Sequence, residues 1–393
     1  MKKYYLWLTV FILSISIAAS FTLASCKSEK VVDVEEAVEE AVEEVAEEEV
    51  EEEAEEVAEI KTTGPQGQVP VWYSEIELTE EEEVKISDGS FKVAYDQATP
   101  NEFNDTIGKA IESRCNELGM EYVAETMNNM NPATQVENIE NMLALDPDII
   151  VALSVDPVTS REIFKKASEQ GVVLVFASNK PGDFEWKTDY TGGLIIFDFY
   201  EFGSILAEGL NEALNGEGKI GYLYHEAEFF ITNQRDEGFK EAIDEYSGLE
   251  IVAEVPWSGV PDDAETAVSA MIAQNPEING IYIPWSEGAM SAAVALRAAD
   301  RTDVKVVTND IGEDVALEMI KGDNIVTLTQ CKAWQYGLTA VDLGCYGLLG
   351  KDIPAEAILI PGLSATKETI EEVWPEVFNE ELPAQLKEAL EQD

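Results

Sequence analysis

Few of the side chains that usually perform catalysis stand in a suitable pattern in this chain of 393 residues. It has one histidine, His225, and four cysteines, and none of them forms a CxxC or HExxH pattern. No GxSxG sequence supplies a strained serine, and no Walker A loop is present to hold a phosphate. We therefore predict a protein that is not an enzyme and that uses no cofactor and no metal.

The formal net charge of −54 restricts the partners of the protein. A surface this acidic repels the phosphate backbone of nucleic acids and the anionic headgroups of membranes. We therefore expect no nucleic-acid partner, and contact with a membrane would need a covalent or hydrophobic anchor. Hydrophobic residues make up 45% of the chain, which is enough for one large or two medium folded domains.

Cys26 stands at the end of a segment that could supply such an anchor. Two lysines open the chain, residues 4–19 are almost wholly apolar, and the sequence LASC ends at Cys26. This arrangement resembles the lipobox of a bacterial lipoprotein signal. The resemblance implies cleavage after residue 25 and lipidation of Cys26, and two or more acyl chains anchor a protein stably. The alternative is an uncleaved signal anchor, because the apolar run is long for an ordinary signal peptide.

The segment after Cys26 is strongly acidic. Residues 33–59 contain sixteen acidic residues and no basic one. Valine and alanine recur every three to four positions, as in an amphipathic helix, but glutamates four residues apart repel one another. We expect an extended or partly helical tether, with a stable helix or coiled coil as the alternative. Glycines and prolines mark residues 61–70, so we assign 1–25 to the signal peptide and 26–84 to the linker.

From residue 91 onward, short apolar segments alternate with amphipathic ones. The expected strands are 91–97, 120–126, 148–155, 172–178, 193–199, 219–225, 251–257, 278–285, 304–310 and 325–330. The expected helices are 105–118, 132–145, 159–170, 202–214, 233–246, 262–275, 288–299 and 334–349. Fully apolar strands between helices indicate parallel sheets covered on both faces, so we predict an α/β fold of two similar units in tandem.

Several stretches resemble the bacterial solute-binding proteins of the ribose/galactose type, which are extracytoplasmic receptors of ABC importers. The stretches are QATPNEFND, NPATQVENIENMLALDPDIIVALSVDP, TNQRDEGFKEAI, VVTNDIGE and IVTLTQ, and the likeness covers roughly residues 85–375. It implies two lobes, each a mostly parallel sheet with helices on both faces, joined by three crossing strands at a hinge. The expected N-terminal lobe is 85–198 with 331–356, the C-terminal lobe is 199–330 with 357–375, and 376–393 is a tail.

The resemblance also implies a ligand site between the lobes, at the carboxyl ends of the strands. Taken residue by residue, it assigns ligand contacts to Asn101, Phe103, Asn179, Lys180, Arg235, Asp310 and Gln330. Two positions depart from the family pattern. The polar pair after the fourth strand is often Asp-Arg and is Asn179-Lys180 here, and Trp285 or Ser286 stands where the family has asparagine. The pattern for ribose itself therefore does not transfer.

These side chains suit a sugar or a polyol, which carries hydroxyls around its rim and CH groups on its faces. Arg235 offers a rigid fork of donors and Asp310 accepts, while amide side chains do both. Aromatic rings at strand ends could stack on the faces of the ligand. The candidates for this role are Phe103, Trp257 and Trp285, and further candidates for the cleft are His225, Phe230 and, in a separate loop, Trp186.

Each candidate also has a purely structural alternative. Arg235 could pair with a carboxylate on a helix surface, Asp310 could cap a turn, and Asn101 could stabilise a turn. The aromatic residues could belong to the core.

The predicted function is capture of a monosaccharide or polyol by a monomeric, lipid-anchored receptor outside the cytoplasm, which delivers it to an ABC permease in the membrane. The alternatives are a sensor for chemotaxis or signalling and a binder of a nucleoside or furanone signal.

Overall fold

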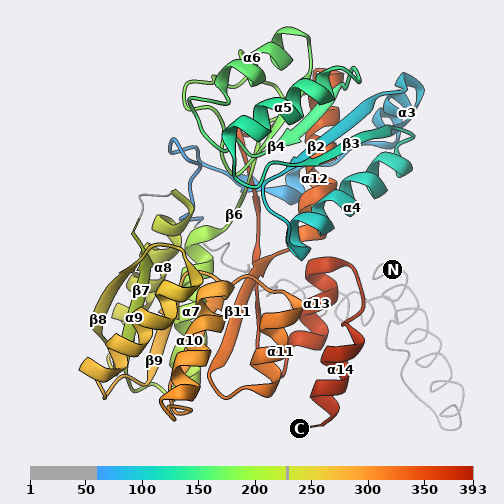
Figure 1. Cartoon of the computed structure of the whole chain (residues 1–393). Coiled ribbons are helices and arrows are strands. Elements are labelled where there is room, and N and C mark those ends of the chain that lie inside the picture. The colour runs from blue at the N-terminus through green and yellow to red at the C-terminus, as the bar shows by residue number, and fades with distance from the viewer. Residues whose placement is uncertain (1–59, 227–229, 393) are drawn as a thin grey trace, which may run out of the picture. The chain divides into compact units, whose positions relative to one another are not determined.

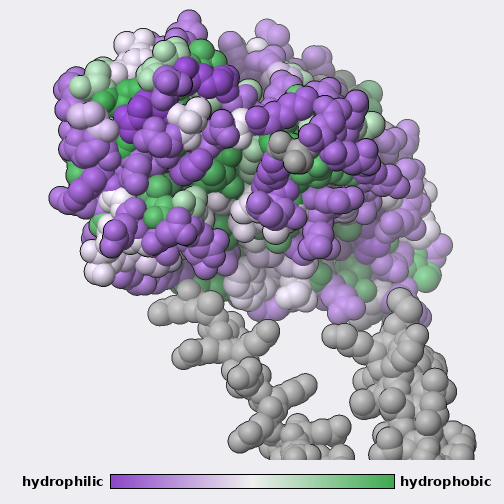
Figure 2. All heavy atoms as spheres, turned by 90° about the horizontal axis from the view of Figure 1, so that it is seen from below, coloured by the Kyte–Doolittle hydropathy of each residue, from purple (hydrophilic) through white to green (hydrophobic). Residues whose placement is uncertain are grey.

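The computed structural model describes residues 60–226 and 230–392 (Figure 1). Cys26, the signal sequence and the acidic tether lie outside the described residues, so the interpretations of these segments stay predictions. Within the described ranges, every helix is too short or too polar to cross a membrane. Hydrophilic residues dominate the face of the molecule shown in Figure 2.

Seven strands form the sheet of the N-terminal lobe, and all of them are parallel. In spatial order they are β1 (Val71–Trp72), β12 (Ala357–Ile360), β6 (Leu194–Phe197), β5 (Val173–Ala177), β4 (Ile149–Ala152), β2 (Lys92–Gln97) and β3 (Glu121–Met127). The four residues of β4 are all apolar and all buried, because helices cover both faces of the sheet.

Alternate residues of these strands pack against different helices. The helices α5 (Pro132–Leu143) and α6 (Arg161–Glu169) share one core with one face of the sheet. The opposite face packs on α4 (Glu102–Glu117) and α12 (Ala333–Leu349). The short helices η1 (Tyr73–Glu75) and α3 (Glu80–Gly89) complete this lobe.

Six strands form the sheet of the C-terminal lobe. In spatial order they are β13 (Gly362–Ala365), β11 (Ile325–Cys331), β10 (Lys305–Asn309), β9 (Gly280–Ile283), β7 (Gly218–His225) and β8 (Leu249–Trp257). Only the β13–β11 pair in this sheet is antiparallel. The spacing of Gly216–Gly221 fits GxGxxG, but this segment leads into β7 instead of following a strand, so it lacks the context of a nucleotide-binding turn.

Helices again cover both faces of this sheet. One face packs on α7 (Phe199–Ala213) and α8 (Phe230–Glu245). The other packs on α9 (Pro261–Gln274), α10 (Ser286–Ala298) and α11 (Glu313–Lys321). The chain ends in α13 (Ile370–Phe378) and α14 (Ala384–Glu391).

The chain crosses between the lobes three times (Figure 1). It passes at Asp198 between β6 and α7, at Lys332 between β11 and α12, and at Pro361 between β12 and β13. The predicted two-lobed α/β fold with three crossings is therefore confirmed.

Three predicted boundaries need correction. The third crossing lies at Pro361 instead of after residue 356, because β12 pairs with β1 and β6 in the N-terminal lobe. Residues 60–84 are folded instead of forming a linker, since they include β1, η1 and the start of α3. The expected tail 376–393 contains α14, whose Leu386 and Ala389 are buried.

Residues 60–72, which we call the hinge strap, lie across the crossing at Asp198. The hydroxyl of Thr62 is fully buried, donates a hydrogen bond to the carboxylate of Asp198 and accepts one from the backbone N–H of Tyr200 at 3.0 Å. The backbone N–H of Thr63 donates to Oε1 of Gln234 in α8 at 2.8 Å. Because β1 at the other end of the strap pairs with β12, the strap joins both lobes.

Candidate ligand-binding site

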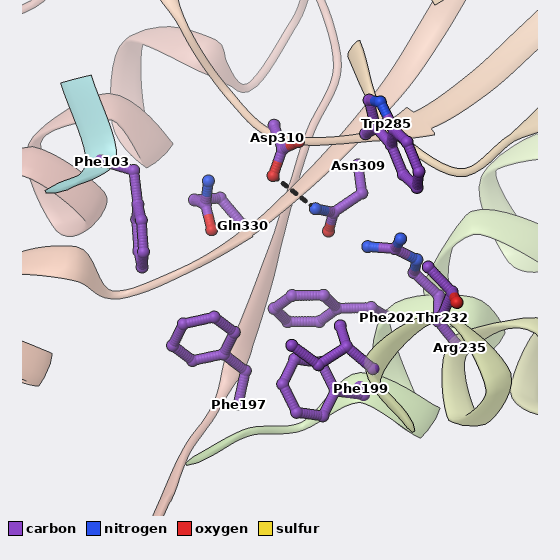
Figure 3. A pocket seen from close by; sticks show the side chains of 11 residues that line it. Phe103, Phe197, Phe199, Phe202, Thr232, Arg235, Trp285, Asn309, Asp310 and Gln330 are labelled. Atoms are coloured by element: carbon purple, nitrogen blue, oxygen red, sulfur yellow. Dashed lines mark hydrogen bonds between the residues drawn. The ribbon is translucent and has the colours of Figure 1, made fainter. Parts of the chain in front are cut away.

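A cavity of about 190 Å³ lies where the C-terminal lobe meets Phe103 of the N-terminal lobe (Figure 3). This cavity has room for several water-sized groups, as a small ligand requires. The lining residues are Phe103, Phe197, Phe199, Phe202, Ile231, Thr232, Arg235, Trp285, Asn309, Asp310 and Gln330.

Arg235 is the only cation of this lining, and it is only 3% exposed. It lies on α8, one turn after Thr232, so both side chains are on the same face of the helix. Its Nε has no hydrogen-bond partner. A buried polar atom without a partner is costly, and an acceptor on a bound ligand would remove that cost.

Asp310 brings an anionic acceptor into the same cavity. It follows β10 with a positive φ of 76°, a left-handed conformation that aspartate tolerates better than most residues. Its backbone N–H donates to the carbonyl of Thr329 at 2.9 Å, and Nδ2 of Asn309 donates to its Oδ1 at 2.6 Å. Burial raises the pKa of Asp310 to about 6, against the opposing effects of Arg235 and of neighbouring amides. At neutral pH the carboxylate is therefore mostly ionised.

Further hydrogen bonds fix the orientation of the two amides beside Asp310. Oδ1 of Asn309 accepts from the hydroxyl of Thr329 at 3.0 Å, and Oε1 of Gln330 accepts from the backbone N–H of Cys331 at 3.0 Å. The NH₂ group of Gln330 interacts with the carboxylate of Asp310, and its second hydrogen can still be donated to a ligand. The polar side of the cavity therefore offers donors at Arg235 and Gln330 and an acceptor at Asp310.

Phenylalanine rings form the opposite side of the cavity (Figure 3). The ring of Phe197 lies edge-on to Phe103, with centroids 5.4 Å apart, and 5.3 Å from Phe199. Phe202 stacks on Phe197 at 6.4 Å. These rings can cover the apolar faces of a ligand whose polar groups point toward Arg235 and Asp310.

Trp285 is the aromatic wall on the side of Arg235 (Figure 3). Its ring is flanked by Trp257, with centroids 4.5 Å apart, and by His225 at 5.0 Å. Trp257 is 1% exposed, and its Nε1 donates to the carbonyl of Val260 at 2.7 Å. Nδ1 of His225 is buried without a partner, and burial lowers the pKa of this histidine. Trp257 and His225 therefore back Trp285 instead of lining the cavity.

The other predicted contact residues also lie outside this cavity. Asn101 caps α4, where its Oδ1 accepts from the backbone N–H of Asn104 at 2.9 Å, and Nδ2 of Asn179 donates to the carbonyl of Ser154 at 2.9 Å. Phe230 packs on Phe199 with centroids 5.8 Å apart.

Lys180 and Trp186 have neighbours of their own in the N-terminal lobe. Lys180 is buried, and its Nζ donates to the carbonyl of Phe184 at 2.5 Å and lies 3.6 Å from Glu356. Trp186 forms an isolated bridge with Tyr190. These contacts are structural, and a direct contact between any of these residues and a ligand stays a prediction.

Several lining residues were missed from the sequence. They are Phe197, Phe199, Phe202, Ile231, Thr232 and Asn309. The sequence FDFYEF at 197–202 contains three of them, directly after an apolar strand at the first crossing. Thr232 lies three residues before Arg235, and Asn309 adjoins Asp310, so helical spacing and the strand end were the available signals.

The lobes and the cavity beside their crossings define a two-lobed binding protein. The chain belongs to the family of the periplasmic binding protein domain, whose model matches residues 95–352. Within residues 60–226 and 230–392, no group of histidine, cysteine and carboxylate side chains is arranged to hold a metal ion.

One curated relative is the D-apiose import binding protein of Actinobacillus succinogenes, which is 28% identical over 155 residues. This match covers 39% of the chain and spans half the length of that relative.

Two solved structures share the fold. A solute-binding protein from Agrobacterium vitis with bound α-D-tagatopyranose has a TM-score of 0.64 and 22% identity, over 74% of this chain and 100% of that one. A solute-binding protein from Bacillus halodurans with bound myo-inositol has a TM-score of 0.61 and 21% identity, over 73% of this chain and 98% of that one.

Proposed function

We propose that the protein is the solute-binding receptor of an ABC importer and that it captures a monosaccharide or polyol in the cavity around Arg235. The observation that carries this proposal is the buried guanidinium of Arg235, with a free Nε, in one small cavity with the carboxylate of Asp310 and several aromatic rings. Hydroxyl groups can accept from the first and donate to the second, while CH faces pack on the rings.

Ligand binding is coupled to closure of the two lobes. The C-terminal lobe supplies the polar groups, and Phe103 comes from the N-terminal lobe. A ligand that contacts both lobes favours the closed state, because only that state makes all of the contacts. Rotation about the crossings at Asp198, Lys332 and Pro361 would provide the motion, and the closed form would be the one that a permease recognises.

The proposal includes attachment outside the cytoplasm through lipid on Cys26. It rests on the LASC sequence after an apolar run. A full-length Cys26→Ala variant is expected to lose labelling by a radioactive fatty acid and to leave the membrane fraction. Labelling and membrane retention that are both unchanged would refute the anchor without affecting the ligand site.

Calorimetry against pentoses, hexoses, polyols and nucleosides tests the binding proposal. We expect a sugar or polyol to bind, and we expect Arg235→Met and Asp310→Asn each to lower its affinity about 10- to 100-fold, the usual effect of losing a hydrogen bond to a charged group. Arg161→Gln is the matched control, because Arg161 pairs with Asp183 on the surface of the other lobe. The absence of heat and of a thermal shift with every sugar and polyol would refute the proposal.

A further inference from the structure

A second cavity, of about 180 Å³, adjoins the ligand site and is lined mainly by residues of the N-terminal lobe, with Ile231 of α8 from the other lobe. Phe103, Phe197 and Ile231 line both cavities and therefore stand between them. Part of the remaining wall of the second cavity is apolar, with Ile107, Leu153 and the aromatic faces of Tyr95 and Tyr336 among its members. Two hydroxyl groups also line it: Oγ1 of Thr99 accepts from Nδ2 of Asn104 at 3.0 Å, and Ser178 is hydrogen-bonded to Tyr336.

The one carboxylate in the wall of the second cavity is Asp96, and it is already saturated. It accepts from the hydroxyl of Thr126 at 2.7 Å and from the amides of Asn128, Asn138 and Gln135 at 2.8, 2.8 and 3.1 Å. A carboxylate with four donors has little capacity left for a ligand hydroxyl.

The amides in the wall of the second cavity are also engaged. Nδ2 of Asn104 donates to the carbonyl of Thr99 at 3.0 Å, and its Oδ1 accepts from the hydroxyl of Tyr95 at 3.3 Å. Oδ1 of Asn101 accepts from the backbone of Asn104. A ligand hydroxyl placed here would lose its water without gaining an equivalent partner, which is unfavourable.

The two cavities therefore differ in what they can bind. The first leaves Nε of the buried Arg235 without a partner and holds the acceptor Asp310, so it suits hydroxyl groups. The second offers few free polar groups and suits an apolar substituent. The polar pair Asn179 and Lys180 does not restore polarity on the N-terminal side, because their amide and ammonium groups donate to the carbonyls of Ser154 and Phe184.

We propose that the ligand is a monosaccharide with one apolar substituent, such as a methyl group in place of a hydroxymethyl group, an alkylthio group in place of a hydroxyl, or an alkyl group on a hydroxyl oxygen. The hydroxylated ring lies against Arg235 and Asp310, and the substituent extends past Phe103 and Phe197 into the second cavity. This inference rests on the proposed binding of a sugar and specifies its chemical class.

Calorimetry with matched pairs of sugars tests it on the full-length protein. The probes are ribose with 5-deoxyribose and 5-methylthioribose, and glucose, mannose and galactose with their methyl glycosides and 6-deoxy forms. We expect the substituted member to bind about tenfold or more tightly than its parent in at least one pair, since one methylene in a fitting pocket changes affinity about 10- to 200-fold.

Two variants that fill the second cavity test whether the preference for the substituted sugar arises there. Ala98 lies in the loop after β2 and Ala177 at the end of β5, and both line the second cavity without lining the first. We expect Ala98→Leu and Ala177→Leu each to abolish the preference for the substituted sugar while leaving the affinity of the parent sugar within about threefold. Thermal melting shows whether each variant is folded, and one folded variant is sufficient.

The possible failures are distinguishable. Parent sugars that bind at least as tightly as every substituted partner would overturn the apolar substituent and leave the proposed function intact. A folded variant that weakens parent and substituted sugars equally would overturn the separate role of the second cavity. Failure of every sugar to bind would overturn this inference together with the proposed function.

Discussion

The ring centroids of Trp257 and Trp285 lie 4.5 Å apart, with 42° between the ring planes, yet only Trp285 lines the ligand cavity. The aromatic wall on this side therefore has two layers: Trp285 faces the cavity, and Trp257 behind it is fully buried. Since the inner ring is also held by the hydrogen bond from its Nε1 to the carbonyl of Val260, it limits the positions that Trp285 can adopt.

The two tryptophans are expected to respond differently to replacement by alanine. Trp285→Ala removes a half-buried ligand wall, so we expect ligand affinity to fall about tenfold or more with a small loss of stability. Trp257→Ala leaves a large cavity in the core and should lower the free energy of unfolding by about 3–5 kcal/mol. Urea denaturation and calorimetry measure the two effects. A Trp285→Ala protein with unchanged affinity would contradict the assignment of this wall.

Ligand affinity is expected to depend on pH through Asp310. Burial raises the pKa of this carboxyl to about 6, and only the ionised form accepts hydrogen bonds with both oxygens. Affinity should therefore fall as the pH is lowered from 7 to 5. Calorimetry across this range measures it, and the Asp310→Asn protein should show a much flatter profile. A wild-type affinity that is constant from pH 7 to 5 would show that ionised Asp310 does not contact the ligand.

The stability of the ligand-free protein should change in the opposite direction. Burial raises the pKa of Asp310 and Asp342 to about 6 and that of Glu201 to about 7, and the nearby Asp198 adds to the effect on Glu201. Folding then favours the protonated forms. Stability from these groups is present below pH 4 and is lost as the pH rises through 6 to 7.

For Asp310 alone, the loss of stability on raising the pH past its pKa of about 6 is of the order of 3 kcal/mol. Thermal melts at pH 4.5 and 7 of the wild-type, Asp310→Asn and Glu201→Gln proteins measure these contributions. Each substitution should reduce the decrease in melting temperature with rising pH. An unchanged decrease in both variants would show that these carboxyls do not titrate as expected.

The hinge strap should stabilise the folded protein. Thr62→Val keeps the shape of the side chain but removes the hydroxyl that bonds Asp198 and the backbone of Tyr200. Leaving buried polar groups unpaired costs about 1–3 kcal/mol, which we expect as a lower free energy of unfolding in urea. Thr302→Val on an exposed loop is the control. Equal stability of the two variants would mean that the strap adds nothing at the hinge.

Lys180 allows a direct test of a contact predicted from the sequence. The structure uses its ammonium group on the carbonyl of Phe184 and near Glu356, away from the ligand cavity. Lys180→Met should therefore reduce stability by about 1–3 kcal/mol while changing ligand affinity less than about threefold. A folded variant with affinity reduced tenfold or more would instead support a ligand contact for Lys180.

The regular part of the fold was predictable because its strands are apolar runs between amphipathic helices. The segment AILIPGLSA at 357–365 was not predictable in the same way. Two strands of different sheets are separated there by Pro361 alone, and local sequence does not reveal a crossing of one residue. The strap was missed for a related reason, because the polar Thr62 becomes buried only through partners more than a hundred positions away in the sequence.

The site was predictable where a residue follows a strand or lies on an inward helix face. Arg235, Asp310, Gln330, Phe103 and Trp285 all line the cavity. The sequence could not separate a ring that lines the cavity from one that backs it, so Trp257 and Trp285 looked equivalent. The sequence FDFYEF after an apolar strand marked Phe199 and Phe202, but it did not show that side chains this deeply buried still border the cavity.

The strap has a mechanical consequence. Thr62 and Thr63 attach beside the first crossing, close to the axis about which the lobes would turn. In a rotation, points near the axis are displaced the least. Under the proposed closure, the strap is therefore held where the relative movement of the two lobes would displace it least.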